Sequence, residues 1–479
     1  MAAPYGLEGV MRLLLVEDEA DVVSSIADVL DSSDELVSVS SRDDAVELLG
    51  RDQAFDLVVC DLRIPPAGGE GLLAHEDHGI AVFAACRRYL PGTPVRFFSG
   101  KGSLDNLADA LSEGGPVDLV GDGSRWKLVH VHQKRDARNF VEELLRLRDA
   151  LLGLERSVDL EGDEIAQTGT QRALRIFARQ VGADRAIVHE AGSHAAGLSG
   201  ADTLAVRFVD QNGVTRARRF VKVADHVRID AEIDAFDRFV PALLTTGFTA
   251  RGTILRHGLR GHSAISYVLA EGFSDNMFTI LGRSEDQAIA ALDRMIRHVD
   301  PWKPPWNAET ISVADMRRRL ITDEQAAELG EDLSEYQEYE RVEVSVPIAV
   351  CHGDFHGGNL LVRHDGEPIM IDFGDVGLNW SAIDPVTLEL SLAFHPASPF
   401  LRSGWPSTQA AREFLHLDSY LQDCPVPAFV RRVREWALEI LGGDEVALRS
   451  LVYAQALRQL RYPDTDHEIA RSFGQGCCR

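Results

Sequence analysis

The sequence predicts two folds in one chain: an α/β domain on a doubly wound parallel sheet, followed by an α+β domain with two lobes. Three observations support this. The first ~150 residues alternate apolar runs with helical patterns, which is typical of a parallel sheet covered by helices. Strand-like segments around a Gln211-Asn212-Gly213 turn come next. Helical patterns dominate the remainder.

In the first part, short apolar runs predict four buried strands, at residues 12–16, 55–60, 94–98 and 128–131. Helical patterns follow at residues 21–30, around 43–49, and at 136–152, where leucines recur along one face. The polar, acidic segment 157–163 then marks a change in composition. We therefore expect the first domain to cover residues 1–155.

In the second part, residues 186–189, 202–210, 218–223 and 265–269 have the pattern of strands. The segments after them are mostly helical, with proline-rich loops between them. We therefore expect a β-rich lobe at residues 156–271 and a helical lobe at residues 272–479.

The composition excludes some classes of function. The formal net charge is −26, with acidic residues in excess in both parts, whereas nucleic-acid binding needs basic surface. No run of about 20 apolar residues is present, and the six cysteines lack the paired spacing of a zinc site. These features predict a cytoplasmic protein with no nucleic-acid or membrane partner.

Polar residues follow the predicted parallel strands where those strands end. They are Glu17, Asp18, Asp61, Ser99 and Lys134. Carboxyl ends of parallel strands meet in one crevice, so we expect these side chains to converge. Neighbouring carboxylates need a hard cation such as Mg²⁺, and one of them can accept a phosphoryl group.

The segments LLLVEDEADV and FDLVVCDLRIPP, with Ser99-Gly100 and Gln133-Lys134, resemble the response-regulator receiver family over roughly residues 11–150. The resemblance implies a flavodoxin-like fold and phosphorylation by a sensor histidine kinase. The implied roles are Mg²⁺ binding for Glu17, Asp18 and Asp61, phosphoacceptor for Asp61, switch hydroxyl for Ser99, and phosphate binding for Lys134. Two alternatives stay open: merely solvated acids at the strand ends, and a receiver-like docking domain without phosphorylation.

The most specific motif is VCHGDFHGGNLLV at residues 350–362, followed by IMIDFGD at 369–375. Phosphoryl transfer needs a carboxylate beside the attacking hydroxyl and oxygen ligands for the cation on the ATP phosphates. Asp354 suits the first need, and Asn359 and Asp372 suit the second.

This region resembles the aminoglycoside phosphotransferase/choline kinase family, whose fold is protein-kinase-like. The resemblance implies Asp354 as catalytic base and Asn359 and Asp372 as ligands of Mg²⁺, with His352 and His356 as scaffold. Asp375 and Asp384 match acids whose roles we leave open. Residues 198–201, Phe220–Lys222 and Glu232 also resemble kinase-like ternary-complex-associated domains.

The β-rich lobe should then bind ATP. The chain has only five lysines, and Lys222 ends a predicted strand where it can bind phosphate and pair with Glu232. The adenine is expected near Leu269 and Glu271, where the chain passes to the next lobe. A solvated Lys222 is the simpler alternative.

Two functions follow from these patterns. The first is a receiver-regulated, ATP-dependent phosphotransferase acting on an alcohol group of an unidentified small molecule or protein. The second is a receiver joined to an inactive pseudokinase that serves as a binding scaffold. The sequence leaves open the acceptor, the sign of regulation, the cognate histidine kinase, and a homodimer formed through the receiver.

Overall fold

The computed structural model of the protein describes residues 11–51, 54–69, 71–100, 115–189, 201–243, 247–269, 272, 275–303 and 307–478. The chain forms two compact units. The described part of the first covers residues 11–189, 201–229 and 251–268, with the gaps above. The second holds the described residues of 230–250 and those from 269 onward.

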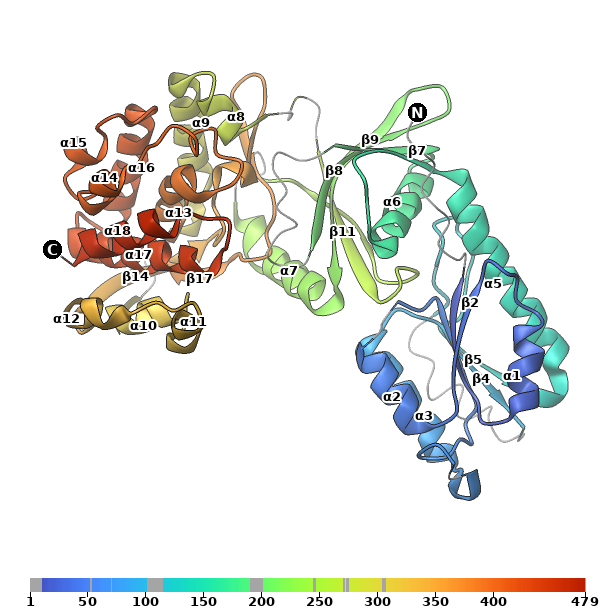
Figure 1. Ribbon diagram of the computed structural model, residues 1–479. Coiled ribbons are helices and arrows are strands. Elements are labelled where there is room, and N and C mark those ends of the chain that lie inside the picture. Colours follow the sequence, from blue (N-terminus) through green and yellow to red (C-terminus); the bar gives the residue numbers. More distant parts are fainter. Residues whose placement is uncertain are drawn as a thin grey trace. The chain divides into compact units, whose positions relative to one another are not determined.

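A five-stranded parallel sheet opens the first unit, in the order β2-β1-β3-β4-β5. Its strands are β1 (Arg12–Val16), β2 (Glu35–Val39), β3 (Leu57–Cys60), β4 (Val95–Ser99) and β5 (Val129–Gln133). The helices are α1 (Ala20–Ala27), α2 (Arg42–Arg51), α3 (Glu76–Tyr89) and α5 (Ala137–Ser157). Figure 1 shows α1 and α5 on one face and α2 and α3 on the other, so the sheet is doubly wound, as predicted.

A six-stranded sheet follows in the same unit, in the order β10-β11-β9-β8-β7-β6. Its strands are β6 (Asp159–Gly162), β7 (Arg185–His189), β8 (Asp202–Val209), β9 (Thr215–Asp225), β10 (Arg251–Leu255) and β11 (His262–Val268), with α6 (Thr168–Gln180) beside them. All its described pairings are antiparallel except β6 with β7. The predicted turn joins β8 to β9, and its Gly213 has φ +81°, a conformation that glycine adopts without strain.

One continuous hydrophobic core links these two sheets. It runs from Leu57 of β3 through Leu147 and Leu154 of α5 to Phe177 of α6 and Val221 of β9, all buried. Apolar area removed from water is the main favourable term in folding. The receiver-like sheet and the β-rich sheet are therefore parts of one packed body.

A buried ion cluster joins the same two sheets. Asp56, one residue before β3, pairs with Arg172 of α6 and with Arg260 of the β10–β11 loop. The Nη2 of Arg260 lies 3.0 Å from Asp56 Oδ2, and the backbone N–H of Arg12 donates to the same oxygen at 2.8 Å. Burial opposes ionisation, yet Arg172 and Arg260 lower the pKa of Asp56.

Two glycines allow close contact between loops of the two sheets. A Cβ on Gly92 would lie 1.9 Å from the carbonyl oxygen of Arg256, and one on Gly258 would lie 2.3 Å from that of Leu119. Larger residues at either glycine would force the backbones apart. The loops before β4 and β5 therefore lie directly against the β10–β11 loop.

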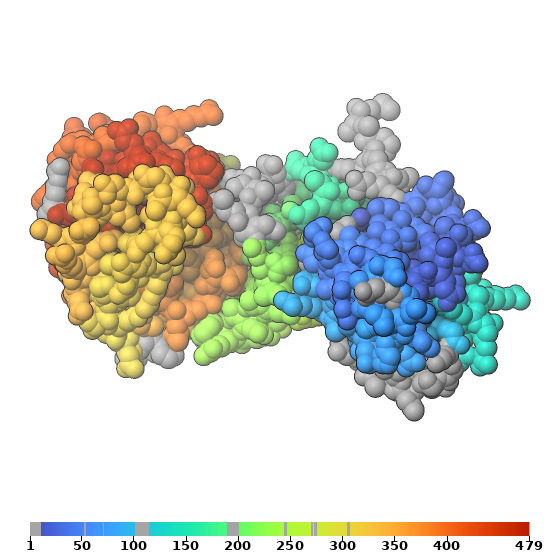
Figure 2. Space-filling view, turned by 60° about the horizontal axis from the view of Figure 1, so that its bottom comes forward, coloured from blue at the N-terminus to red at the C-terminus, as the bar shows by residue number. Residues whose placement is uncertain are grey.

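The second unit is mainly helical. Its helices are most of α7 (His226–Phe239), then α8 (Met277–Leu281), α9 (Glu285–His298), α10 (Val313–Arg318), α11 (Asp323–Glu328), α12 (Gln337–Glu340), α13 (Ile383–Phe394), α14 (Thr408–Arg412), α15 (Leu417–Tyr420), α16 (Pro427–Ile440), α17 (Glu445–Arg458) and α18 (His467–Cys477). Figure 2 shows the α10–α12 segment (yellow) against the C-terminal helices (red), consistent with the contacts of α10 with α17.

Two small antiparallel sheets position the loops of the second unit. One consists of β12 (Asp275–Asn276), β15 (Leu360–Val362) and β16 (Pro368–Met370); the other of β13 (Ala308–Ser312), β14 (Glu343–Cys351) and β17 (Gly377–Trp380). The predicted combination of a doubly wound parallel sheet with a β-rich and a helical part is confirmed. Among the described residues, no helix has both the length and the apolar character to cross a bilayer.

Some elements were missed. Residues 159–162, which the sequence assigned to a domain boundary, form β6, and α5 extends to Ser157. The strands β2 and β10 and helix α6 had no prediction. The division at residues 155 and 271 stays a prediction.

Replacing Asp56 with Ala should lower the free energy of unfolding of the first unit by about 3–5 kcal/mol, because two buried guanidinium groups lose their partner. Hydrogen exchange of the β3 and α6 amides measures this loss. Asp43→Ala is the matched control, since Asp43 is exposed and forms its ion pair with the neighbouring Arg42; it should leave exchange unchanged. Equal exchange in both variants contradicts the prediction.

Candidate functional site

The first candidate site lies at the carboxyl ends of the parallel strands. Glu17 follows β1, Asp61 follows β3, Ser99 ends β4, and Lys134 follows β5. Glu17, Asp61 and Ser99 are 3%, 5% and 3% exposed. The sheet therefore brings the predicted residues to one edge, as their strand-end positions require.

Lys134 lies at the centre of this site. Its Nζ is 2.9 Å from Glu17 Oε2, 2.8 Å from Asp61 Oδ2 and 3.1 Å from Glu19 Oε1. Although burial lowers its pKa, the bonds to Asp61 and Glu17 raise the pKa of Lys134 overall. The ammonium thus neutralises carboxylates that would otherwise repel one another.

The carboxylates form a donor set that suits a hard divalent cation. Oxygens of Glu17, Glu19 and Asp61 all lie within 4.8 Å of one another, and Mg²⁺ prefers carboxylate oxygens. Glu19 was missed because the motif places the acid pair one position earlier. Asp18 lies outside this closest group, although burial and the charge of Asp61 raise its pKa.

The second candidate site lies in the second unit, where β14 runs into residues 352–359. The Nδ2 of Asn359 donates to the carbonyl oxygen of Asp354 at 2.9 Å. The amide of Ile371 donates to the carbonyl oxygen of Asn359 at 3.1 Å, which places Asp372 next to the same loop. The structure therefore brings the two halves of the motif together.

Asp384 of α13 anchors the start of this loop. Its two carboxylate oxygens accept hydrogen bonds from the amides of His352 at 2.8 Å and Gly353 at 3.0 Å. Gly353 has φ +82°, and a Cβ there would lie 2.4 Å from the carbonyl oxygen of Asp375, so glycine is required. The role of Asp384, left open from the sequence, is to hold the backbone beside Asp354.

The histidines of the motif contact neighbouring parts of the site, and His356 Nε2 lies 3.6 Å from Asp354 Oδ2. The Nε2 of His352 lies 3.0 Å from the carbonyl oxygen of Ile371, which ties the two motif segments together. His356 packs against His395 with ring centroids 4.2 Å apart, and burial lowers the pKa of His356 to about 4 and that of His395 to about 3. Both rings are therefore neutral at pH 7.

Asp354 and Asp372 are less buried than the residues that hold them. The Asp354 side chain is 36% exposed, and Asp372 is half-buried with φ +62°. A non-glycine residue with positive φ costs roughly 1–3 kcal/mol and occurs preferentially at functional sites. The loop thus presents two carboxylates and one amide that suit a divalent cation and an incoming hydroxyl.

The predicted nucleotide-binding residues are only partly described. Lys222 is buried in β9, paired with Ile265 of β11 and Thr203 of β8, and Glu232 is 1% exposed on α7. Leu269 directly follows β11. Glu271 and residues 198–200 lie outside the described residues, so their predicted roles stay predictions.

The pH dependence of stability tests the geometry around Glu17. Burial raises the pKa of Glu17 to about 7 from 4.5, so the folded protein holds a proton that the unfolded chain releases. The stabilisation that protonated Glu17 gives the folded protein is full below pH 4.5, and it is lost as the pH rises through 7. Between pH 5 and 8, without divalent cations, the wild type should lose about 2–3 kcal/mol relative to Glu17→Gln. Hydrogen exchange of the β1 amides measures this loss of unfolding free energy. Parallel pH profiles for the wild type and Glu17→Gln contradict the prediction.

Comparison with known proteins gives matches for parts of the chain. Residues 195–415 match the family described as the phosphotransferase enzyme family. The chain is 30% identical over 186 residues to the alginate biosynthesis transcriptional regulatory protein AlgB of Pseudomonas aeruginosa, and 30% identical over 110 residues to the response regulator protein FleR of the same organism. These matches cover 38% and 23% of this chain, and 38% and 21% of the relatives' own lengths.

Solved structures give weaker likenesses. The amicoumacin kinase hAmiN, in complex with AMP-PNP, Ca²⁺ and Ami, is 16% identical, with 60% of this chain and 85% of that chain covered and a TM-score of 0.28. An aminoglycoside-3'-phosphotransferase of type VIII is 20% identical. The match covers 50% of this chain and 90% of that chain, with a TM-score of 0.29. At TM-scores this low, the likeness says nothing about substrate or mechanism. The family match and the two relatives nevertheless establish that the chain joins a response-regulator-like N-terminal region to a domain that matches the phosphotransferase enzyme family.

Proposed function

We propose that this protein is a response regulator whose receiver, phosphorylated on Asp61 by a sensor histidine kinase, controls an ATP-dependent phosphotransferase. The phosphotransferase acts on a hydroxyl group of a small molecule or protein. The observation that carries the proposal is the loop of residues 352–359, which Asp384 anchors beside Asp354 inside the family-matched region. ATP as phosphodonor implies a cytoplasmic location.

In this proposal Asp354 is the general base. It accepts the proton of the acceptor hydroxyl as that oxygen bonds to the γ-phosphorus of ATP, while the bond from the γ-phosphorus to the β,γ-bridging oxygen breaks and ADP leaves. Asn359 and Asp372 hold the divalent cation, with Mg²⁺ the expected ion. When bound, the cation neutralises charge on the phosphates. The hydrogen bond from Asn359 to the backbone of Asp354 supports a fixed relation between base and ligand.

Lys222 and Glu232 complete the proposed ATP site. A lysine on a central strand binds the phosphates in kinase-like domains, and a glutamate on the following helix orients it. The burial of both side chains supports this assignment, because buried Lys and Glu are rare unless they are paired. Leu269 and Glu271 are proposed to contact the adenine.

At the receiver, an Asp61 oxygen attacks the phosphorus of the donor phosphohistidine, and the phosphorus–nitrogen bond breaks. Glu17 and Asp18 hold Mg²⁺ with Asp61, and Lys134 and Ser99 contact the phosphoryl oxygens. Glu19 lies close enough to join them. The existing bond of Lys134 to Asp61 supports these roles, since the ammonium is already directed at the acceptor oxygen.

Strand β3 is the proposed route from the receiver to the β-rich sheet. Asp61 follows the strand and Asp56 precedes it, so four residues, about 13 Å of strand, separate the phosphorylated end from the buried ion cluster. Asp56 binds Arg172 of α6 and Arg260 of the β10–β11 loop. A displacement of β3 therefore acts directly on the sheet that carries Lys222.

Turnover of γ-labelled ATP with Mg²⁺ and a panel of alcohol acceptors tests the enzyme proposal. Asp354→Asn should lower the transfer rate by roughly 10²–10⁴-fold, because it removes the general base while keeping the side-chain shape. Asp365→Asn is the matched control, since Asp365 is an exposed residue of the β15–β16 hairpin, and it should transfer at the wild-type rate.

Three outcomes separate the alternatives. Equal rates for wild type and Asp354→Asn exclude Asp354 as the base. Binding of Mg-ATP without turnover on any acceptor indicates a nucleotide-binding scaffold. No binding of Mg-ATP excludes the phosphotransferase proposal.

Acetyl phosphate, a small phosphodonor, tests the control by the receiver. Adding it should change the transfer rate of the wild type by roughly 5–150-fold, the usual range of coupling between two sites. In Asp61→Asn, the ratio of the rates with and without acetyl phosphate should be one. Asp43→Asn, an exposed acid on α2, should keep the wild-type ratio. A ratio of one in the wild type contradicts the coupling.

A further inference from the structure

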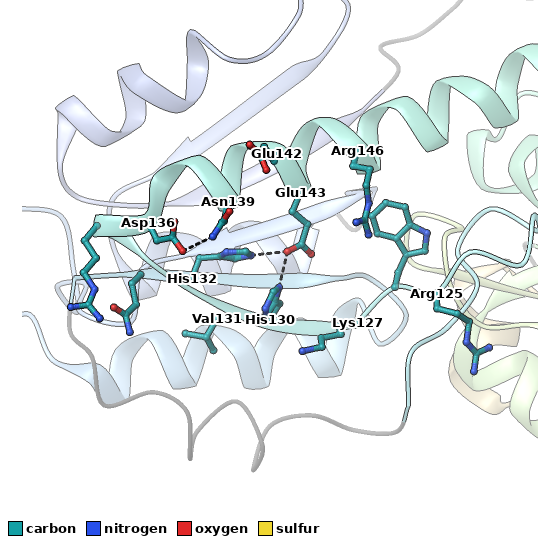
Figure 3. Close-up of a pocket in the computed structure, with 13 residues that line it drawn as sticks. Arg125, Lys127, His130, Val131, His132, Asp136, Asn139, Glu142, Glu143 and Arg146 are labelled. Atoms are coloured by element: carbon teal, nitrogen blue, oxygen red, sulfur yellow. Dashed lines mark hydrogen bonds and ion pairs between the residues drawn. The ribbon is translucent and has the colours of Figure 1, made fainter.

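A pocket of about 780 Å³ lies beside β5 and α5, and its lining includes Gln133 and Arg135 on either side of Lys134. Residues just before β5, on β5 and on α5 line it, and Figure 3 shows His130, His132 and Glu143 pointing toward one another between strand and helix. Arg146 of α5 lies over the Trp126 ring, 4.8 Å from its centre. The proposed phosphotransferase and receiver chemistry use none of these residues.

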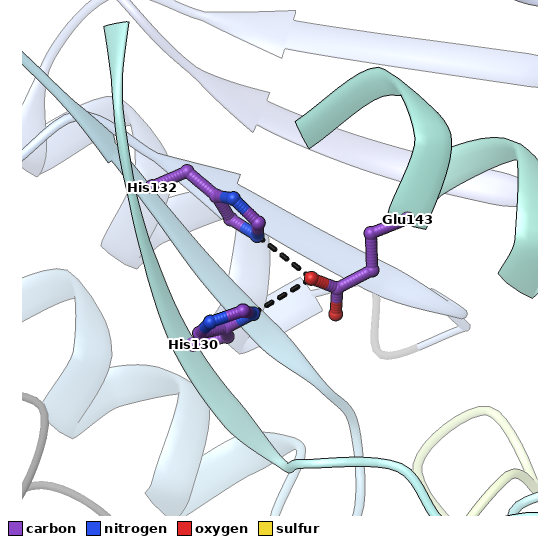
Figure 4. A group of neighbouring side chains, drawn as sticks. All are labelled: His130, His132 and Glu143. Carbon is purple, nitrogen blue, oxygen red and sulfur yellow. Dashed lines mark hydrogen bonds and ion pairs between the residues drawn. The ribbon is translucent and has the colours of Figure 1, made fainter. Parts of the chain in front are cut away.

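Two histidines of β5 point to one carboxylate of α5. His130 and His132 are two residues apart, so they project from the same face of the strand. His130 Nδ1 lies 2.7 Å from Glu143 Oε2, and His132 Nε2 lies 2.8 Å from the same oxygen. Figure 4 shows both rings directed at Glu143.

Arg96 of β4 orients this carboxylate. Its Nε lies 2.7 Å from Glu143 Oε1, and Arg96 is 2% exposed. One carboxylate oxygen is therefore held by a buried guanidinium, while the other faces the two imidazoles. Ligating carboxylates in metal sites are held by hydrogen bonds in this way.

We propose that His130, His132 and Glu143 bind a divalent transition-metal ion, with Zn²⁺ the best match to two imidazole nitrogens and one carboxylate oxygen. The three ligand atoms lie within 4.8 Å of one another. Tetrahedral Zn²⁺ bonds of about 2.0–2.1 Å place ligand atoms roughly 3.3 Å apart. Each imidazole nitrogen is therefore roughly half an ångström too close to the Glu143 oxygen, and the two nitrogens, which lie within 4.8 Å of each other, also have to settle at roughly 3.3 Å.

The fourth ligand comes from the pocket. The His130 side chain is 35% exposed, whereas that of His132 is 7% exposed, so the site opens on the His130 side. Four cationic residues line the pocket, Arg125, Lys127, Arg135 and Arg146, and they outnumber the acids Asp136 and Glu142 in the same lining. They favour an anionic oxygen as fourth ligand, such as hydroxide, which offsets the added charge of the ion.

The alternative is a purely hydrogen-bonded cluster, in which both imidazoles donate to Glu143. Replacing the histidines with amide side chains distinguishes the metal site from the hydrogen-bonded cluster. Asn can donate from nearly the position of His Nδ1 and Gln from that of His Nε2, but neither is a good Zn²⁺ ligand. The double variant His130→Asn, His132→Gln therefore keeps the hydrogen bonds and removes metal ligation.

Zn²⁺ titration of the untagged full-length protein by calorimetry is the test, with excess Mg²⁺ to compete at the Glu17/Glu19/Asp61 carboxylates. The wild type should bind one equivalent, and the double variant should bind at least roughly 10–100-fold more weakly, the loss that even an outer-shell change produces. Co²⁺ should give the visible spectrum of a tetrahedral nitrogen/oxygen site without a thiolate band. Zn²⁺ should also raise the melting temperature of the wild type but not of the variant.

Cys424→Ser, Cys478→Ser is the matched control, because these are the partly exposed cysteines among the described residues; it should bind Zn²⁺ like the wild type. Circular dichroism of the His130→Asn, His132→Gln variant verifies its fold. Equal affinity in the wild type and that variant, or no saturable Zn²⁺ binding in the wild type, would overturn the proposal and leave the hydrogen-bonded cluster.

Discussion

The first unit depends on one buried carboxylate, Asp56, shared by the guanidinium groups of Arg172 and Arg260. Each of these charges alone in the interior would cost several kcal/mol, so the three must be buried together. That requirement holds α6 and the β10–β11 loop at the start of β3, where the continuous hydrophobic core also joins the two sheets. Receiver-like and β-rich sheets are consequently packed into one body at the start of β3.

Sequence patterns predicted four of the five strands of the parallel sheet, because most of them contain short apolar runs and polar residues follow them directly; β2, with the sequence ELVSV, was missed. They could not predict the Asp56 cluster, since Arg172 and Arg260 lie 116 and 204 residues away along the chain. Strand β6 was missed for a different reason: its sequence is DLEG, with Leu160 as its only buried residue, so no apolar run marks it. Tertiary pairing with β7 decides its conformation.

The same contrast applies to the sites. Asp354, Asn359 and Asp372 stand in contiguous motifs, so their positions were predictable, but the backbone anchor Asp384 became evident only from its hydrogen bonds to His352 and Gly353. The histidines of β5 carried no signal, because VHVHQ has the ordinary alternation of a strand with one polar face. Their partner Glu143 lies on a helix, and only the packing of α5 on the sheet brings it near.

The position of β5 connects the proposed metal site to phosphorylation. Lys134 follows this strand and bonds to Asp61, while His130 and His132 on the strand bond to Glu143 of α5. In the proposed mechanism a phosphoryl group on Asp61 would bond to Lys134 at the end of β5, and the proposed ion would link the histidines of the same strand to Glu143 of α5. If the ion binds one arrangement of β5 more tightly, the two events are coupled reciprocally. Phosphorylation then changes the affinity for the ion, and the ion changes the phosphorylation equilibrium by the same factor. Helix α5 continues into the core shared with the β-rich sheet, and four strands of that sheet, β8, β9, β10 and β11, lie within the family-matched residues 195–415.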